Sequence, residues 1–174
     1  VFYSAELTVR MGSHVDDFLA KGRRSKMEKF YTALAKRIAM KPIVYLQEGG
    51  HIRHLGMDVE LTRRNGRKWY RVTQQRDIEA YLDERGIKVG RVVSAPGGSK
   101  EALMKASPEL TPTRAREFRS DLGTLQFWAT RTRWDMQQRV SRLSSVMQHP
   151  TEAAEKELRK VLVYLRSHPE ICVE

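Results

Sequence analysis

Residues 7–20 of the chain read LTVRMGSHVDDFLA, and this stretch carries the clearest signal for how the fold begins. Apolar and β-branched residues at 7–9 and 18–20 flank the tetrapeptide 14–17, and Gly12 and Gly22 punctuate the pattern. Such a pattern is typical of two short strands that are joined by a tight turn. We therefore predict a β-hairpin within residues 1–22, with Asp16 and Asp17 near its tip.

The two adjacent carboxylates favour a particular chemistry. Like charges side by side repel, so the pair is costly unless a cation neutralises it. Ligation by oxygen alone favours magnesium or manganese. The alternative is a solvated surface turn, because aspartate is a common turn residue, and the dipeptide by itself favours that plainer explanation.

The charge of the chain points to an anionic partner. The 174 residues carry a formal net charge of +11, and the isoelectric point is near 10.0. Residues 1–110 hold 21 basic and 13 acidic side chains, a net of +8, whereas residues 111–174 hold 11 and eight, a net of +3. A nucleic acid would suit a basic field around a carboxylate pair. The alternatives are an acidic protein surface and a charge that only keeps the chain in solution.

Composition excludes several classes of protein. A hydrophobic content of 40% and a charged content of 30% fit a globular protein with one domain or two small ones. No apolar run approaches the roughly 20 residues that a membrane span needs, and the opening residues do not resemble a secretory signal. The single cysteine, Cys172, excludes an internal disulfide and a cysteine-based zinc site. We expect an intracellular protein that is not secreted and has no membrane partner.

The first helix and the strands after it are predicted from local signals. The pattern Ser-x-x-Glu at 25–28 predicts a capping box that opens a helix, and Pro42 is expected to end it. Its apolar face would consist of Met27, Phe30, Tyr31, Leu34 and Ile38. Beyond it we expect a short strand at 43–46, a turn at Gly49-Gly50 and a strand around 52–62.

A second hairpin is predicted at Asn65-Gly66, with its return strand at 68–72. Basic residues crowd this hairpin, with two aromatic residues among them: Arg63, Arg64, Arg67, Lys68 and Arg71, with Trp69 and Tyr70. Such a mixture suits a nucleic-acid backbone with some base stacking. The alternative is a charged edge hairpin that prevents association between sheets.

The remainder is predicted to be helical. A helix should begin at Thr73 or Gln74 and end before Gly86. Residues 88–110 lack sustained periodicity and indicate a linker. Start signals at 111–112, 132–135 and 150–151 then predict a three-helix bundle. The inner stripes of these helices are Ala115, Phe118, Leu122, Leu125 and Trp128; Met136, Val140, Leu143 and Met147; and Ala154, Leu158, Val161, Leu162 and Leu165.

Seven motifs occur in a specific order along the chain, and they lie at 15–17, 38–41, 54–59, 74–82, 119–125, 132–136 and 143–165. In this order and spacing the chain resembles the reverse transcriptase of Ty1/copia-type retrotransposons over nearly its full length. Val15-Asp16-Asp17 is similar to that family's catalytic hairpin. The chain departs from the pattern at His14, where the family has an aromatic residue, and at Trp134, where it has proline.

The resemblance implies an α+β fold: a partial polymerase palm of β-hairpins plus two helices, followed by a three-helix thumb or connection bundle. The palm half would span residues 1–87, the linker 88–110 and the thumb 111–174. The family's fingers, the first palm half with its first metal-binding aspartate, and the RNase H module would all lie outside residues 1–174.

The resemblance also implies roles for particular residues. Asp16 and Asp17 would bind Mg²⁺ or Mn²⁺ in the complete palm, and Lys41 would lie near the triphosphate or donate a proton to the leaving group. A helix-end lysine that complements the helix dipole is the alternative for Lys41. The segment His54, Leu55, Gly56 and Met57 would form a strand that supports the primer end. The partners would be an RNA or DNA template–primer duplex and a deoxynucleoside triphosphate.

Three functions remain open on the sequence. The chain is expected to be part of an RNA-directed DNA polymerase that is inactive by itself. The alternative is a degenerate retroelement remnant that serves only as a basic nucleic-acid-binding module. The third is a metal-free regulatory helical protein, which would leave the order of the motifs to chance.

Overall fold

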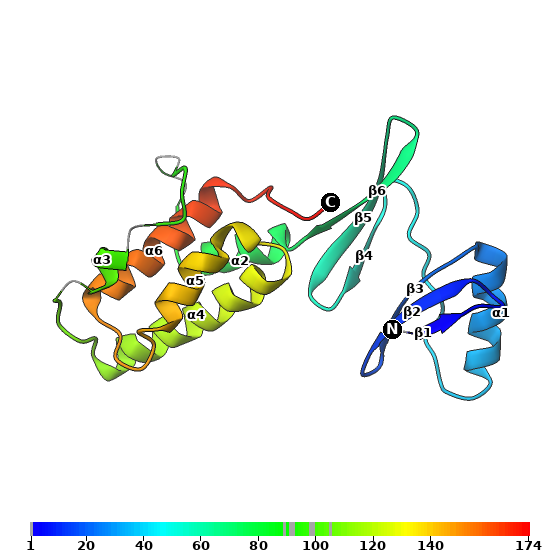
Figure 1. Ribbon diagram of the computed structural model, residues 1–174, viewed down its shortest axis with the longest axis horizontal. Coiled ribbons are helices and arrows are strands. Elements are labelled where there is room, and N and C mark those ends of the chain that lie inside the picture. The colour runs from blue at the N-terminus through cyan, green and yellow to red at the C-terminus, as the bar shows by residue number, and fades with distance from the viewer. Residues whose placement is uncertain (1, 89, 91–92, 98–99, 105) are drawn as a thin grey trace. The chain divides into compact units, whose positions relative to one another are not determined.

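The computed structural model describes residues 2–88, 90, 93–97, 100–104 and 106–174, and it is a mixed α+β structure. The chain divides into two compact units, one ending at Arg71 and the other beginning at Val72 (Figure 1). We call them the sheet unit and the helical unit. None of the helices in the described ranges is both long enough and apolar enough to cross a bilayer.

The first sheet of the sheet unit contains the predicted hairpin. Its three antiparallel strands lie in the order β1-β2-β3: β1 Phe2–Ser4, β2 Val9–His14 and β3 Asp17–Lys21. Helix α1, Arg24–Ala35, contacts β2 and covers one face of this sheet (Figure 1). A small core of Val9, Met11 and Met27 is buried there. Gly22 permits this packing, because a Cβ atom at Gly22 would lie 3.0 Å from Val9 Cγ2.

Helix α1 differs from the prediction at both ends. It begins at Arg24 after the extended Arg23, which makes no side-chain capping bond, so Ser25 lies inside the first turn and no capping box forms. It ends at Ala35, well before Pro42, and Ile38 is 42% exposed. Met27 is the buried residue of the helix. Because most helical stability in proteins comes from packing, the residues after Ala35 have little to hold them helical.

The second sheet contains two tight turns where only one was predicted. Its strands lie in the order β4-β5-β6: β4 His51–His54, β5 Met57–Arg64 and β6 Arg67–Thr73. The turn at Asn65-Gly66 is confirmed, with φ values of +51° and +75°. The strand predicted around 52–62 is wrong, because Leu55 and Gly56 reverse the chain with φ values of +50° and +74°. Gly56 supplies the left-handed conformation at the second turn position.

The segment before β4 also corrects a prediction. Residues 43–46 form no strand. Regular pairing is limited to an isolated bridge between Glu48 and Leu61, where the Gly49 amide donates to the Leu61 carbonyl at 2.9 Å. The predicted turn at Gly49-Gly50 is confirmed, since the Gly50 amide donates to the Gln47 carbonyl at 3.0 Å and Gly49 has a φ of +76°.

The helical unit is built as the apolar stripes predict. Its elements are α2 Gln75–Glu84, α3 Lys100–Met104, α4 Pro112–Arg131, the 3₁₀ turn η1 Trp134–Met136, α5 Gln137–Ser144 and α6 Glu152–Ser167. Thr111 and Thr151 cap α4 and α6 through their hydroxyl groups. Every predicted inner residue of α4 and α6 is buried in one shared core. Among the predicted inner residues of the three-helix bundle, Met147 is the exception, because α5 ends at Ser144 and leaves Met147 37% exposed.

Helix α2 belongs to this core and not to the sheets. Ile78 and Leu82 are buried in the same cluster as the residues of α4 and α6. The buried Thr132 hydroxyl donates to Gln74 Oε1 at 2.9 Å, which ties the start of α2 to the end of α4. The chain therefore divides at Arg71, whereas the sequence places the boundary at residue 87. The predicted linker 88–110 contains the short helix α3, and residues 89, 91–92, 98–99 and 105 of it lie outside the described residues.

Candidate metal-binding turn and basic surface

Asp16 and Asp17 lie where the sequence predicts, at the turn between β2 and β3. His14 pairs with Asp17 across the hairpin, and Val15 and Asp16 form the turn. All four residues are exposed, and the Val15 side chain is 86% exposed. The hairpin therefore presents both carboxylates to solvent, where an ion or a substrate can reach them.

The backbone of this turn is strained at Val15. Its φ is +54°, in the left-handed region that a β-branched side chain rarely adopts. Left-handed backbone costs roughly 1–2 kcal/mol for such residues, and asparagine tolerates it better. Strain of this kind is concentrated at functional turns.

Replacing Val15 with asparagine is expected to stabilise the sheet unit by about 1 kcal/mol, because the left-handed backbone no longer opposes a β-branched side chain. Hydrogen exchange of the β2 and β3 amides measures the change. Val44→Asn is the control, since Val44 is also highly exposed, at 75%, but has no positive φ. Equal effects of the two substitutions would show that the turn is unstrained.

The turn does not by itself form a complete metal centre. Across the described ranges, no three histidine, cysteine or carboxylate side chains gather closely enough to hold an ion. Nor does any hydrogen bond or ion pair among the described residues join Lys41 to either aspartate. Lys41 is exposed and lies beyond the end of α1, so the alternative of a helix-end lysine that complements the dipole is wrong. Its carbonyl accepts a bond from the Tyr31 hydroxyl at 2.6 Å.

The predicted primer-support segment forms a turn and not a continuous strand. His54 and Met57 are paired across it, and Leu55 and Gly56 reverse the chain between them. These four residues are half-buried. The next residue, Asp58, is 7% exposed and lies 3.6 Å from the Arg53 guanidinium, so this part of the motif supports the sheet.

The β5–β6 hairpin is exposed to solvent, so a binding partner can reach it. Residues 63–70 are all exposed, and Trp69 and Tyr70 are 41% and 40% exposed. Carboxylates within the sheet unit offset part of its charge: Arg63 Nε lies 3.1 Å from Glu48, and Arg71 Nη1 lies 3.4 Å from Glu60. The predicted set Arg63, Arg64, Arg67, Lys68, Trp69 and Arg71 thus lies together on one hairpin, and Arg63 and Arg71 of this set form ion pairs.

Most of the net positive charge of the chain lies in the sheet unit. Residues 1–71 hold 15 basic and seven acidic side chains, a net of +8, whereas residues 72–174 have a net of only +3. Cations in the sheet unit lie over aromatic rings: Arg10 over Tyr3 at 5.9 Å, Lys21 over Tyr70 at 5.4 Å and Arg24 over Tyr45 at 4.6 Å. Sequence reasoning missed these pairs, because the partners come together only in the folded unit.

Titratable groups in the helical unit hold its helices together. Arg133 is fully buried and bonds Asp135 through two nitrogens, Nε to Oδ1 at 3.0 Å and Nη2 to Oδ2 at 2.8 Å. Its Nη1 donates to the His168 carbonyl at 2.9 Å. Burial alone would raise the pKa of Asp135, but the hydrogen bonds and charge of Arg133 outweigh it and hold that pKa below its ordinary value. The network joins η1 to the end of α6.

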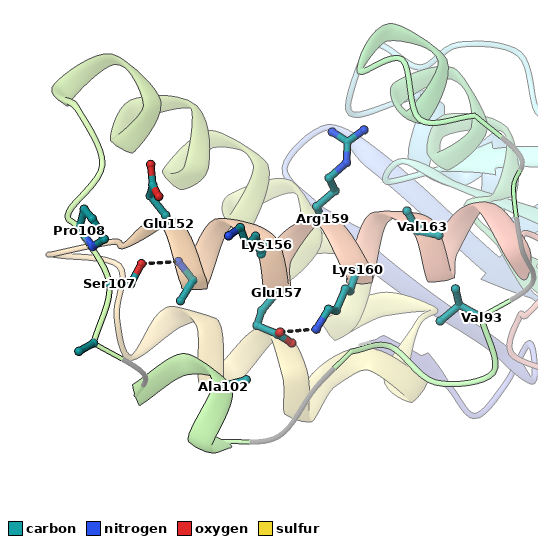
Figure 2. A pocket seen from close by; sticks show the side chains of 12 residues that line it. Val93, Ala102, Ser107, Pro108, Glu152, Lys156, Glu157, Arg159, Lys160 and Val163 are labelled. Carbon is teal, nitrogen blue, oxygen red and sulfur yellow. Dashed lines mark hydrogen bonds and ion pairs between the residues drawn. The ribbon is translucent and has the colours of Figure 1, made fainter.

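A cavity of about 720 Å³ lies along α6 in the helical unit, between this helix and the segment that contains α3 (Figure 2). Two interactions join polar groups that line it. Lys160 Nζ lies 2.5 Å from Glu157 Oε1, and the Ala153 amide donates to Ser107 Oγ at 3.1 Å. Glu157 and Ser107 of the lining are therefore already bonded within the protein.

Comparisons with known proteins found no matching family model and no significant match to a curated protein or a solved structure. The turn, the basic hairpin and the motif order are therefore the observations on which a function can be proposed.

Proposed function

We propose that the chain is part of the RNA-directed DNA polymerase of a retrotransposon, with Asp16 and Asp17 as two carboxylates of its two-metal site. The observation that carries the proposal is the exposed turn itself. Two adjacent carboxylates stand on a strained backbone, in the unit that holds the positive excess of the chain. The motif order supports the same reading, from residue 15 to residue 165.

The side chains at the turn supply some of the ligands that a hard divalent cation needs. Carboxylate oxygens are the donors that Mg²⁺ and Mn²⁺ prefer. Asp16 would be the main ligand and Asp17 a weaker one, and the third carboxylate would come from a strand outside residues 1–174. Asp16 and Asp17 would hold part of this two-metal group, which would supply Lewis-acid activation of the primer hydroxyl and charge stabilisation of the pyrophosphate. The chain's own residues supply negative charge at the turn and positive charge for the nucleic acid.

The other parts of the chain have supporting roles in this proposal. The turn at His54–Met57 would place the primer end through its backbone and shape. Lys41 would approach the triphosphate as a cation. The helical unit would act as thumb and connection, following the duplex through phosphate contacts that carry little sequence information.

Metal binding at the turn is the first test. Two carboxylates without a third ligand are expected to bind Mn²⁺ weakly, with a dissociation constant of about 1 mM. Mn²⁺ should therefore broaden the amide NMR signals of residues 14–18 first. Asp16→Asn and Asp17→Asn should each weaken this broadening, because each removes a negative donor.

Glu6→Gln is the matched control, since Glu6 is an exposed carboxylate of the same unit and its loss changes the charge equally. It should leave the broadening at residues 14–18 unchanged. Broadening that is spread evenly over the exposed acidic residues, or that Glu6→Gln reduces as much as Asp16→Asn does, would reject the metal-binding turn.

A nucleic-acid-binding module without catalysis is the second candidate, and the exposed β5–β6 hairpin favours it specifically. Arg67→Gln and Lys68→Gln are each expected to lower the salt slope of template–primer binding by about 1, because each removes one phosphate contact. Fluorescence anisotropy over a range of salt concentrations measures the slope. Lys29→Gln, on α1, should change it less; equal slopes for all three variants would mean that the hairpin makes no contact.

A further inference from the structure

We propose a second nucleic-acid-binding surface on the sheet unit, for a single strand, formed by Tyr3, Arg10, Lys21 and Tyr70. We call it the tyrosine platform. The proposal rests on the nucleic-acid function proposed above and adds to it a site that recognises bases by stacking. It requires neither metal binding nor catalysis by the chain.

The strand register places three of the four platform residues, and the fourth, Tyr70, comes from the second sheet. Tyr3 pairs with Arg10 across β1 and β2, and Arg10 pairs with Lys21 across β2 and β3. Directly paired residues lie on the same face of a sheet. The Lys21 ammonium then lies 5.4 Å from the centre of the Tyr70 ring, which comes from β6. The result is a row in the order tyrosine, arginine, lysine, tyrosine.

This face of the first sheet is the one that α1 leaves open. Val9 and Met11 point to the face where Met27 of α1 packs, and side chains alternate along a strand, so Arg10 points to the other face. Arg10 and Lys21 are exposed, and Tyr3 is 62% exposed. The platform is therefore accessible, with aromatic rings at both ends.

The two central cations favour an anionic occupant. Like charges directly opposite one another in an antiparallel pair are destabilising. Each cation is partly compensated by a ring, Arg10 by Tyr3 at 5.9 Å and Lys21 by Tyr70 at 5.4 Å. A phosphate group between them would neutralise both. A phosphate flanked by two stacking surfaces is the repeating chemistry of a single-stranded nucleic acid.

Gly12 leaves a flat area on the same face. It pairs with Leu19 and is two residues from Arg10 along β2. A Cβ atom built at Gly12 would meet only the Leu19 carbonyl oxygen, at 3.8 Å, which is ordinary contact. The fold therefore does not demand glycine here, and a glycine inside a strand often marks a place where a ligand approaches closely.

The platform is continuous with the carboxylate turn. Asp17, Leu19 and Lys21 alternate along β3 and so share the open face. Asp17 and Lys21 are four residue steps apart along β3, a span of about 13 Å. A strand bound on the platform would thus lie along the sheet that ends in the carboxylate pair.

Single-strand binding tests the proposal with the chain as it is. A fluorescein-labelled oligothymidine is titrated with the protein and followed by anisotropy. Tyr3→Ala should weaken binding about tenfold, because one stacking surface is lost, and Tyr3→Phe should restore it. Phe2→Ala is the matched control: Phe2 is 63% exposed but lies on the α1 face of the same strand, so binding should be unchanged.

Two further variants test the charge and the flat area. Arg10→Gln should lower the salt slope by about 0.7, the value for one phosphate contact with a single strand. Lys29→Gln, with the same change of net charge, should have a smaller effect. Gly12→Val should leave the circular dichroism spectrum unchanged and weaken binding, because its side chain would stand on the open face.

The outcomes separate this proposal from the proposed function. Equal weakening by Tyr3→Ala and Phe2→Ala would overturn the platform, while Mn²⁺ binding at the turn and duplex binding by the β5–β6 hairpin could still stand. Binding of polyglutamate with the same sensitivity to Tyr3→Ala would also overturn it and would identify an acidic protein as the occupant. If the chain bound no oligonucleotide at all, both the platform and the nucleic-acid function would fall.

Discussion

Replacing Asp135 with alanine is expected to lower the free energy of unfolding of the helical unit by about 3 kcal/mol, the lower end of the range for breaking a buried ion pair. Arg133 has no exposed surface, and Asp135 accepts bonds from two of its nitrogens. Removing the carboxylate leaves a guanidinium in the interior that still contacts the His168 carbonyl and the Tyr164 ring but has lost its counter-charge. The loss is large because that charge can neither reach water nor lose its proton.

Urea unfolding of the variant and the parent chain, followed by exchange of the α4 and α6 amides, measures this loss. Glu109→Ala is the control within the helical unit. Glu109 lies 3.6 Å from His149, but both side chains are mostly exposed, at 68% and 76%, so its loss should cost less than about 1 kcal/mol. Similar losses for the two variants would show that the Arg133–Asp135 pair is not specially stabilising.

The same pair predicts how stability depends on pH. The pKa of Asp135 is lower in the folded state than the ordinary carboxyl value. Its contribution is therefore fully present above the ordinary value of about 3.9 and is lost as the pH falls through the folded pKa. Acid unfolding of the helical unit should be steeper for the parent chain than for Asp135→Ala over that window. Parallel acid titrations of the two chains would contradict this origin of the pH dependence.

The elements that the sequence predicted well are those with a complete local signal. Helix α4 has a threonine cap, proline at its first position and a long apolar stripe, and each of these features is present as expected. The Asn65-Gly66 turn and the hairpin with Asp16 were predicted for the same reason. Both have strand-forming flanks and a turn residue that favours reversal, Gly66 in one and Asp16 in the other.

The predictions that were wrong concern elements that depend on packing between residues far apart in the sequence. The length of α1 could not be predicted, because its apolar face looks continuous to Ile38 although the structure buries little of it. The turn at Leu55-Gly56 was hidden, because an apolar residue stands where asparagine usually stands. Helix α2 was assigned to the sheets, because its neighbours in the core, on α4 and α6, are remote in sequence.

The features of the candidate site also differ in how far the sequence predicts them. The position and exposure of Asp16 and Asp17 followed from local turn chemistry. The ion pairs of Arg63 with Glu48 and of Arg71 with Glu60 did not, since they depend on how strands approach one another. The tyrosine platform could not be predicted from the sequence for the same reason, because its four residues come from four strands.

Under the proposed function, the second large effect is expected at Asp16, in a chain extended by the strand to which the proposal assigns the third carboxylate. Asp16→Asn should reduce nucleotide addition to a template–primer by more than about 100-fold. Residues that only orient metal ligands already contribute 10- to 100-fold, and a direct ligand contributes more. Glu6→Gln should keep the parent rate, because Glu6 lies on the exposed surface away from the turn residues 15 and 16. The Asp16→Asn variant should still bind duplex, because the basic surface is intact.

Primer extension by the chain completed in this way, with and without Asp16→Asn, is the most direct measurement of the central claim. The proposed function predicts extension with Mg²⁺ or Mn²⁺ that depends on Asp16 and is indifferent to Glu6. A completed chain that binds template–primer tightly but never extends it, or that extends it equally well after Asp16→Asn, would contradict the assignment of the turn as part of a polymerase site.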